Sequence, residues 1–432
     1  MKNSPAGRTG PAVSPFRGLL YNRKKIRKME KVVAPPYDVI SPSYRSELYK
    51  RDRHNVVRLI LPSGADPYSA AARTFQQWCH DDILTQNGKP SFYLYHQTFM
   101  IHGRKFVRKG IMGIRRLEPW GRSILPHERT LAAPKRDRLR LLRECQANLS
   151  PVFSLYSDPS RQCEKWFSKM REKPLFDLTT EDGIRHQFWS ISDPEQVKKV
   201  SSLLSRKTLY IADGHHRYET ALAYSKEEKG RKGADSVMMF FSNLNDPGLV
   251  VLPTHRLYHS PIVWDWKKIT RRAGKVFTIK TYSVTQKKLF LAAFQKSSKI
   301  KLGVILGKKV AGSGPAFALF ETSAQKFRGS SLAKGLAPHR LVLGSSLLHD
   351  LFVPRVLGIK GARASLEENF TFEKEIEDVL KKVSRGEATA GFLLPSPKVS
   401  DVVSICERGE VLPQKTTFFY PKLLSGLVFH KF

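Results

Sequence analysis

The segment KTLYIADGHHRYETALAY, residues 207–224, carries the clearest structural signal in the chain. Its apolar first half predicts a short buried strand over 207–212, and the spacing from His216 to Lys229 predicts an amphipathic helix. Where a strand ends directly at a helix start, free backbone N–H groups and the positive end of the helix dipole lie at one point. The segment therefore predicts an α/β fold with an anion-binding turn between strand and helix.

The residues of this turn have the chemistry of a phosphate site. Gly214 permits a sharp turn and a close approach of the backbone to a ligand. His215, His216 and Arg217 can donate hydrogen bonds to phosphate oxygens, and Asp213 can cap the helix or hold a divalent cation. In the alternative interpretation these residues are an N-cap, a turn glycine and two surface histidines. A run of polar residues between two apolar elements favours the phosphate site.

A second candidate site is the segment PHERT, residues 126–130, which precedes a helix expected over 134–148. Glu128 lies between His127 and Arg129, and the neighbouring positive charge would keep its carboxylate ionised, as a general base or a metal ligand requires. The alternative is a capping or surface carboxylate. We expect the arginines of the following helix to form a solvated face.

Five further residues are candidates for the same cleft. Lys415 and Thr416 offer an ammonium and a hydroxyl from the C-terminal part, although the chain contains neither GxxxxGK[ST] nor a GxGxxG that opens a helix. His255 and Arg256 end another expected strand, and Asp38 follows a rigid Pro-Pro-Tyr turn. No His/Cys cluster in the sequence has the spacing of a zinc site.

A chain of 432 residues is too long for one ordinary hydrophobic core. Composition and turn signals predict four parts: a flexible leader (1–14), an N-terminal α/β part (15–150), a core that contains the DGHHR segment (151–260) and a C-terminal α/β part (261–432). Other segments predict an extended stretch (32–40), a buried strand (56–61), a helix (66–84), a β-hairpin (91–101 and 105–117) and a surface loop (323–336).

The chain is strongly basic, with 74 Lys and Arg against 38 Asp and Glu, a net charge of +36. Residues 1–60 contain 14 of these basic residues and 4 acidic ones, an excess that fits a solvated basic face or, as the alternative, non-specific contact with nucleic acid. No apolar run approaches the roughly 18 residues of a membrane span. Four widely spaced cysteines and a polar N-terminus predict a reducing, cytoplasmic environment.

Several longer blocks occur in a fixed order along the chain: PFRG (15–18), VAPPYDVISP (33–42), LPHERT (125–130), NLSP (148–151), YIADGHHRYETA (210–221), DPG (246–248) and PQKTTFFYPK (413–422). On these blocks the chain resembles the domain-of-unknown-function 1015 family of prokaryotic proteins over nearly its whole length. The family name implies no function.

The DGHHR segment also resembles the phosphate-binding motif of the ParB/sulfiredoxin superfamily, which includes CTP-binding ParB, ATP-using sulfiredoxin and an ADP-dependent kinase of free serine. The kinase shares a His-Glu segment upstream. That resemblance implies a sulfiredoxin-like nucleotide-binding core, with Glu128 as the base, Asp213 as a Mg²⁺ ligand, and His215, His216 and Arg217 on the phosphates. Residue 215 is His and not Cys, which argues against sulfinic-acid reduction.

Together these observations predict a mixed α/β protein that binds a nucleotide (ATP, ADP or CTP) with Mg²⁺. The predicted reaction is transfer of a phosphoryl group to a small hydroxyl-bearing metabolite, or hydrolysis of a phosphoryl group on such a metabolite. The alternative is a ParB-like, nucleotide-gated module that binds DNA or a protein partner and has no small-molecule substrate. The net charge favours the alternative, and the absence of a recognisable helix-turn-helix pattern argues against it.

Overall fold

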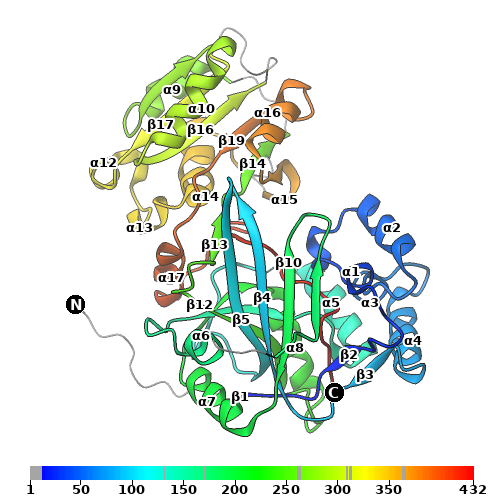
Figure 1. The fold of residues 1–432 in the computed structure, drawn as a ribbon. Coiled ribbons are helices and arrows are strands. Elements are labelled where there is room, and N and C mark those ends of the chain that lie inside the picture. The colour runs from blue at the N-terminus through cyan, green and yellow to red at the C-terminus, as the bar shows by residue number, and fades with distance from the viewer. Residues whose placement is uncertain are drawn as a thin grey trace. The chain divides into compact units, whose positions relative to one another are not determined.

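The computed structural model describes residues 12–432, except for 131, 169–171, 260–263, 308, 309, 311–313 and 362–365. The chain divides into two compact units, the first comprising Met1–Val250 with Phe419–Phe432 and the second Val251–Phe418 (Figure 1). The boundary expected near residue 150 lies inside the first unit, and the last residues return to that unit. Each unit is described by itself below.

The first unit is built on a nine-stranded mixed sheet in the order β6-β11-β8-β12-β5-β4-β10-β9, with β1 paired to β5. The pairs β11–β6 and β12–β8 are parallel, and the other pairs are antiparallel. The strands are β1 (Val13–Ser14), β4 (Phe92–Ile101), β5 (Arg104–Arg116), β6 (Ile124–Leu125), β8 (Val152–Tyr156), β9 (Phe176–Thr179), β10 (Arg185–Ile191), β11 (Leu209–Asp213) and β12 (Ser236–Asn243).

One side of this sheet, here called the helix face, packs against helices. Its buried side chains, including Leu94, Met239 and Ile211, share a core with residues of α6 (Gln162–Phe167), α7 (Pro194–Ser205) and α8 (His215–Glu227). Alternate residues of the same strands point to the opposite side because side chains alternate along a strand. The opposite side therefore requires a separate cover.

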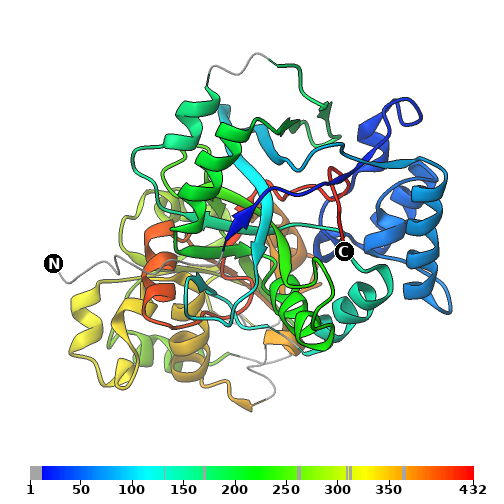
Figure 2. The same ribbon diagram turned by 90° about the horizontal axis from the view of Figure 1, so that it is seen from below.

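The opposite side, here called the tail face, contains aromatic side chains and is contacted by the C-terminal segment. Tyr95 and Phe153 both lie edge-on to Phe240, and Phe153 also contacts Phe419. Beyond Phe419 the chain runs beside the N-terminal segment, where Leu19 pairs with Phe429 (Figure 2). The smaller elements of the unit are β2 (Leu19–Tyr21), β3 (Leu84–Gln86), β7 (Ala147–Asn148), β21 (His430–Lys431), α1 (Met29–Val32), η1 (Tyr37–Val39), α2 (Pro42–Arg51), α3 (Val57–Ile60), α4 (Pro67–His80) and α5 (Ala132–Cys145).

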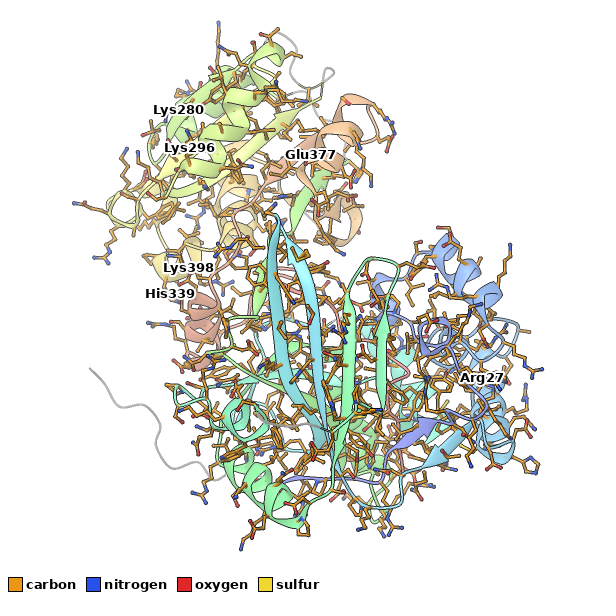
Figure 3. All side chains as sticks on the ribbon, viewed as in Figure 1. Arg27, Lys280, Lys296, His339, Glu377 and Lys398 are labelled. Carbon is orange, nitrogen blue, oxygen red and sulfur yellow. The ribbon has the colours of Figure 1, made fainter. Side chains whose placement is uncertain are left out.

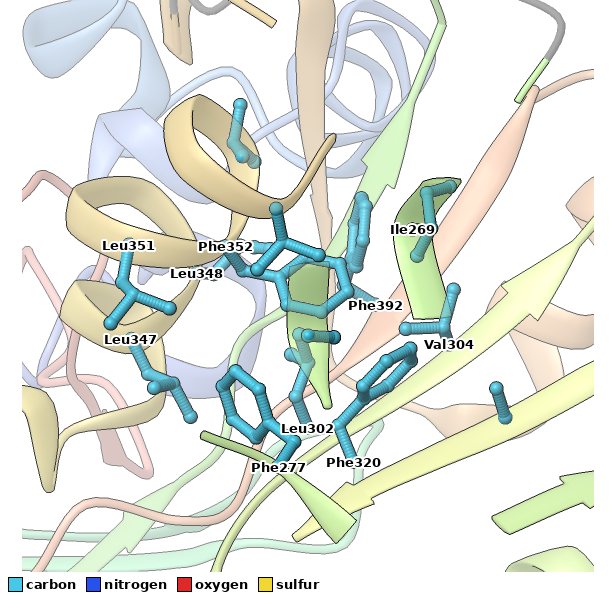
Figure 4. Close-up of a cluster of buried hydrophobic side chains, with 14 of the residues drawn as sticks. Ile269, Phe277, Leu302, Val304, Phe320, Leu347, Leu348, Leu351, Phe352 and Phe392 are labelled. Carbon is cyan, nitrogen blue, oxygen red and sulfur yellow. The ribbon is translucent and has the colours of Figure 1, made fainter. Parts of the chain in front are cut away.

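The second unit contains a six-stranded sheet in the order β15-β17-β16-β19-β14-β18. Phe320, Phe352 and Phe392 pack with leucines of the π-helix η4 in its core (Figure 4). Its elements are β14 (His255–Tyr258), β15 (Thr278–Tyr282), β16 (Ile300–Leu306), β17 (Phe317–Thr322), β18 (Phe370–Glu373), β19 (Ala390–Leu393), α9 (Trp266–Ala273), η2 (Val284–Gln286), α10 (Lys287–Lys296), α12 (Ala324–Arg328), η3 (Ser331–Ala333), α13 (Pro338–Leu341), α14 (Gly344–Ser346), η4 (Leu347–Leu357), α15 (Leu366–Asn369), α16 (Ile376–Ser384) and α17 (Val399–Glu407). Two further strands are β13 (Val250–Leu252) and β20 (Phe418–Tyr420).

The mixed α/β class is confirmed, and so are the elements with a strong local pattern. The hairpin forms as β4 and β5, and the strand-to-helix segment forms as β11 and α8. The helix expected over 66–84 is α4, Pro67–His80. Within the described ranges, no helix is both long and apolar enough to span a bilayer. The leader expected over 1–14 falls largely outside the described residues.

Three local predictions were wrong. The strand expected over 56–61 is the buried helix α3, because a short apolar run fits a buried helix as well as a buried strand. The loop expected over 323–336 contains α12 and η3, whose Phe327 and Ala333 are buried. The stretch expected to be extended over 32–40 is extended only around residues 33–36 and then forms η1.

The turn after β12 generates a prediction about folding. Gly248 is buried, and a Cβ atom there would overlap the backbone of Val107. Asp246 fixes this approach, since its carboxylate accepts the Gly248 N–H at 2.7 Å and the Lys109 N–H at 2.8 Å. Overpacking of this kind costs about 1–3 kcal/mol, so we expect Gly248→Ala to lower the free energy of unfolding in urea by about that amount. Gly88→Ala is the control, because nothing lies within 4 Å of its Cβ position. Equal effects of the two substitutions would contradict the close approach.

Candidate functional site

The turn between β11 and α8 has the predicted geometry. Gly214 is the N-cap of α8 and has φ +91°, in the left-handed region that favours glycine. A Cβ there would lie 3.0 Å from the guanidinium of Arg217, so a larger residue would also push that side chain away. Leu209 to Ala212 are buried, and Asp213 is the first residue of the strand to be partly exposed.

A β-bulge determines which way Asp213 points. Ile211 pairs with Ser154, but the next pair is Asp213 with Phe153, so one extra residue lies between them on β11. A bulge of this kind interrupts the alternation of side chains, so the side chain of the residue after it points to the other face of the sheet. Asp213 is consequently in register with Phe153, which points to the tail face, and is placed where the C-terminal segment can reach it.

Asp213 is the centre of an ion-pair cluster. Its Oδ2 accepts a hydrogen bond from Arg217 at 2.7 Å, and its Oδ1 accepts one from Nζ of Lys422 at 2.9 Å. The three side chains are only 12–18% exposed, so these pairs are partly shielded from solvent. Arg217 also donates to the carbonyl of Pro151, which fixes its guanidinium beside the start of β8. The carboxylate thus holds two cations next to the N-terminus of α8.

Two buried histidines lie beside this cluster. Nε2 of His215 accepts the backbone N–H of His127 at 3.3 Å, and the two rings meet edge to face at 4.7 Å. Nδ1 of His127 lies 2.8 Å from the Ile211 carbonyl, so we infer that Nδ1 carries the proton and Nε2 the lone pair. Burial lowers the pKa of His127 to about 4 and that of His215 well below its ordinary value. Both imidazoles are therefore neutral at pH 7 and add nothing to the positive charge of Arg217 and Lys422.

Glu219 ties helix α8 to the loop that contains His127 and Glu128. Its carboxylate accepts hydrogen bonds from Trp120 at 3.1 Å and Thr130 at 2.7 Å, and pairs with Lys135 at 3.0 Å. Burial alone would raise the pKa of Glu219, but these three donors bring it below its ordinary value. Glu219, two residues beyond the DGHHR segment, thus acts as a structural clamp and holds helix α8 and the His127–Glu128 loop in a fixed relation.

A cavity of about 60 Å³ adjoins Arg217. Arg138 also lines it, with its guanidinium 4.1 Å from the Tyr37 ring centroid and 2.6 Å from the Ile60 carbonyl. Arg138 is buried, so the expectation that the arginines of this helix form a solvated face was wrong for this residue. The other lining residues come from α5, the segment 147–150, α8 and β12: Leu141, Leu142, Ala147, Asn148, Leu149, Ser150, Thr220 and Val237. Three of the sequence blocks quoted above therefore meet at one cavity.

The remaining predicted residues have different surroundings. Glu128 is half-buried and directly follows His127, Arg129 is exposed, and His216 is half-buried in the first turn of α8. Asp38 is exposed and adjoins Tyr37, whose pKa is raised chiefly by burial and further by Asp38.

Four candidates belong to the second unit and have partners there. The guanidinium of Arg256 donates to the carbonyls of Gln414 and Lys415 at 3.2 and 3.0 Å. Nδ1 of His255 accepts the Leu394 N–H at 3.1 Å. Thr416 Oγ1 donates to Ser345 at 3.0 Å. Their participation in a common cleft with Asp213 stays a prediction.

Among the described residues, no group of three or more His, Cys, Asp or Glu side chains could hold a metal ion. Both oxygens of Asp213 accept from cationic side chains, so a metal ion would have to displace Arg217 or Lys422 to bind there. In this arrangement Asp213 fits the role of orienting two cations better than that of a Mg²⁺ ligand.

Sequence reasoning missed Lys422 and Arg138. Lys422 lies within a block that was noted for its resemblance, yet no local pattern links it to Asp213, 209 positions earlier. Arg138 lies in a run of arginines whose spacing does not distinguish the buried residue from the exposed ones.

Comparison with known proteins gives a family and several distant structural similarities. No protein of curated function matches the sequence. A free serine kinase in complex with AMP resembles 68% of this chain over 83% of its own length, with 13% identity and a TM-score of 0.34. SbnI with a C-terminal truncation, from Staphylococcus aureus, gives 73% and 85% coverage, 9% identity and a TM-score of 0.37. A conserved hypothetical protein from Pyrococcus furiosus resembles 69% of this chain over 90% of its own length, with 14% identity and a TM-score of 0.33. Similarities this distant do not identify a function. The model of the family described as protein of unknown function (DUF1015) matches residues 13–316, and the chain belongs to this family.

Proposed function

We propose that the first unit binds the phosphate groups of a nucleotide at the β11–α8 turn. We propose further that it either transfers a phosphoryl group to a small hydroxyl-bearing metabolite or hydrolyses a phosphoryl group on such a metabolite. The observation that carries this proposal is the pairing of Arg217 and Lys422 on Asp213 beside the N-terminus of α8. The N-terminus of α8, with its helix dipole, and two oriented cations favour a multiply charged anion.

Each residue of the turn, and Lys422 of the C-terminal segment, has a distinct proposed role. Arg217 and Lys422 contact phosphate oxygens, and Asp213 keeps both cations oriented before the ligand arrives. Gly214 lets the backbone approach the phosphate, and His216 adds a donor from the first turn of α8. His215 is neutral and holds the His127 backbone, so its contribution is to connect the two loops. Mg²⁺ coordination by Asp213 stays a prediction, and no step of the proposal depends on it.

The acceptor hydroxyl would be activated from the His127–Glu128 segment. Glu128 is the proposed general base, since a carboxylate within about 3 Å of a hydroxyl, or one water away, can accept its proton during transfer. His127 keeps an unprotonated Nε2 at neutral pH by the tautomer inferred above and is a second proposed acceptor. The Glu219 clamp supports this arrangement because it fixes Thr130, two residues beyond Glu128, to α8. The resemblance of both segments to free serine kinase gives the same assignment.

Nucleotide binding is the first test. A nucleotide at a hundred times its dissociation constant should stabilise the protein by about 2.7 kcal/mol, which raises the melting temperature measurably. We expect Arg217→Ala to abolish most of that increase, because it removes a phosphate donor. Arg185→Ala is the control, since Arg185 pairs with Asp177 on an exposed part of the same sheet. An unchanged melting temperature with ATP, ADP, CTP and GTP, each with Mg²⁺, would refute nucleotide binding.

The second test separates catalysis from structure at Glu128. Loss of a general base lowers turnover by roughly 10²–10⁴-fold. We therefore expect Glu128→Gln to slow nucleotide-dependent phosphorylation by that factor and to leave nucleotide affinity and unfolding free energy unchanged. Glu47→Gln, on the exposed surface of α2, should affect none of these quantities. A variant that loses stability but keeps full turnover would show that Glu128 is a structural carboxylate.

One observation favours the alternative of a nucleic-acid-binding module. The basic run Arg23, Lys24, Lys25, Arg27 and Lys28 is exposed, and Arg27 lies at the surface of the first unit (Figure 3). Binding through phosphate contacts alone weakens steeply with salt and has no sequence preference.

We expect duplex DNA to bind only non-specifically and to be released at moderate salt. Fluorescence anisotropy between about 50 and 200 mM salt measures this release. A protein that contacts roughly 6–10 phosphates loses about 10³–10⁵-fold in affinity over that range. Reversal of Lys24, Lys25 and Lys28 to Glu should abolish this binding. A preference of about a thousandfold or more for one duplex sequence would establish the alternative function instead.

A further inference from the structure

A fully buried arginine on the tail face has a role that the proposed reaction leaves unexplained. The guanidinium of Arg108, on β5, lies 4.7 Å from the Phe153 ring centroid and donates through Nε to Gln97 at 3.1 Å. Its Nη2 donates to Gln97 and to the carbonyl of Pro421. Its Nη1 has no hydrogen-bond partner among the described residues, and no carboxylate among them forms an ion pair with Arg108. A buried cation with an unsatisfied donor is costly, so its retention requires an explanation.

Arg108 is connected to the Asp213 cluster by two routes. The first route is the C-terminal segment: Pro421 precedes Lys422, whose carbonyl accepts from Gln97 Nε2 at 2.9 Å. Arg108 and Gln97 together therefore fix the backbone that delivers the Lys422 ammonium to Asp213. The second route is the sheet, because Phe153, which Arg108 covers, is the strand partner of Asp213.

The charge of Arg108 persists at neutral pH. Burial lowers the pKa of Arg108 to about 10, and Asp246 and Asp213 are among the groups that partly oppose this shift. Charge interactions in a buried, poorly polarisable environment extend further than in water. The charge of Arg108 therefore interacts electrostatically with groups to which it is not hydrogen-bonded, including any ligand bound at Asp213.

We propose that Arg108 is a positioning residue of the phosphate site and that its buried charge makes the site select ligands by their number of phosphate charges. The inference rests on the proposed phosphate binding. A neutral donor could hold the Pro421 carbonyl at a lower desolvation cost, so the structural role alone does not account for a cation. The ligand class that follows is a polyphosphate, as in a nucleoside diphosphate or triphosphate, in preference to a single phosphate group.

The test compares orthophosphate with pyrophosphate by calorimetry, which requires no knowledge of the nucleotide base. We expect the wild-type protein to bind pyrophosphate more tightly, and Arg108→Met to reduce the ratio of the two affinities by about tenfold. Arg108→Lys keeps the charge and should keep most of the ratio. Arg185→Met removes the same net charge from an exposed position and should leave the ratio unchanged. A merely structural role would weaken both ligands equally.

Met preserves the apolar contact with Phe153, and apolar replacements of buried charges are often neutral or stabilising, so Arg108→Met is expected to fold. Arg108→Gln gives the same comparison with a neutral side chain that can still donate to Pro421. An unchanged ratio in the folded Met or Gln variant would overturn the inference, and so would an equal loss in Arg108→Lys and Arg108→Met. Failure of the wild-type protein to bind either anion would overturn the proposed phosphate site itself.

Discussion

The arrangement of the first unit depends on the carboxylate of Asp213. Its two oxygens bind cations from two separate parts of the sequence, Arg217 one helical turn away and Lys422 in the C-terminal segment. Both contacts require the bulge in β11, because regular alternation would point Asp213 to the helix face. The C-terminal segment must in turn lie along the tail face, where Phe419 contacts Phe153. A single side-chain direction thus links the sheet, helix α8 and the end of the chain.

The energetics of this cluster explain why its parts depend on one another. Removal of one partner from a buried ion pair typically costs about 3–5 kcal/mol, because the remaining charge stays buried without compensation. The neighbouring histidines cannot substitute for a lost cation, since burial keeps His127 and His215 neutral at pH 7. Acidification toward pH 5 does not charge them either, because the pKa of His127 is about 4 and that of His215 is lower still. His127 and His215 consequently add no positive charge to that of Arg217 and Lys422 across the physiological range.

The parts of the fold that were predictable from the sequence are those with local signals. The hairpin β4–β5 and the β11–α8 turn follow from alternation, helical spacing and a glycine that tolerates positive φ. The apolar run at α3 carried no such signal, since its three buried residues fit either kind of element. In the candidate site, Asp213 was recognisable because it ends a short apolar strand, and His127 because it lies in a polar segment that precedes a helix. Lys422 and Arg108 were not, because their significance arises only when the C-terminal segment packs on a sheet formed hundreds of residues earlier.

Arg217 and Arg108 show how this chain uses backbone carbonyls to hold charge. Each guanidinium donates to a backbone carbonyl, that of Pro151 just before β8 for Arg217 and that of Pro421 in the C-terminal segment for Arg108. A carbonyl fixes the orientation of the side chain but neutralises none of its charge, whereas a carboxylate partner does both. Only Arg217 has such a carboxylate among the described residues, and it shares Asp213 with Lys422. A side chain selected only to join two segments would have no need of a charge, because burial of a charge costs several kcal/mol that a neutral donor avoids. The use of arginine at both positions therefore favours a site whose positive potential serves an anionic ligand. The carbonyls orient the two guanidinium groups, and their charge remains available to attract that ligand.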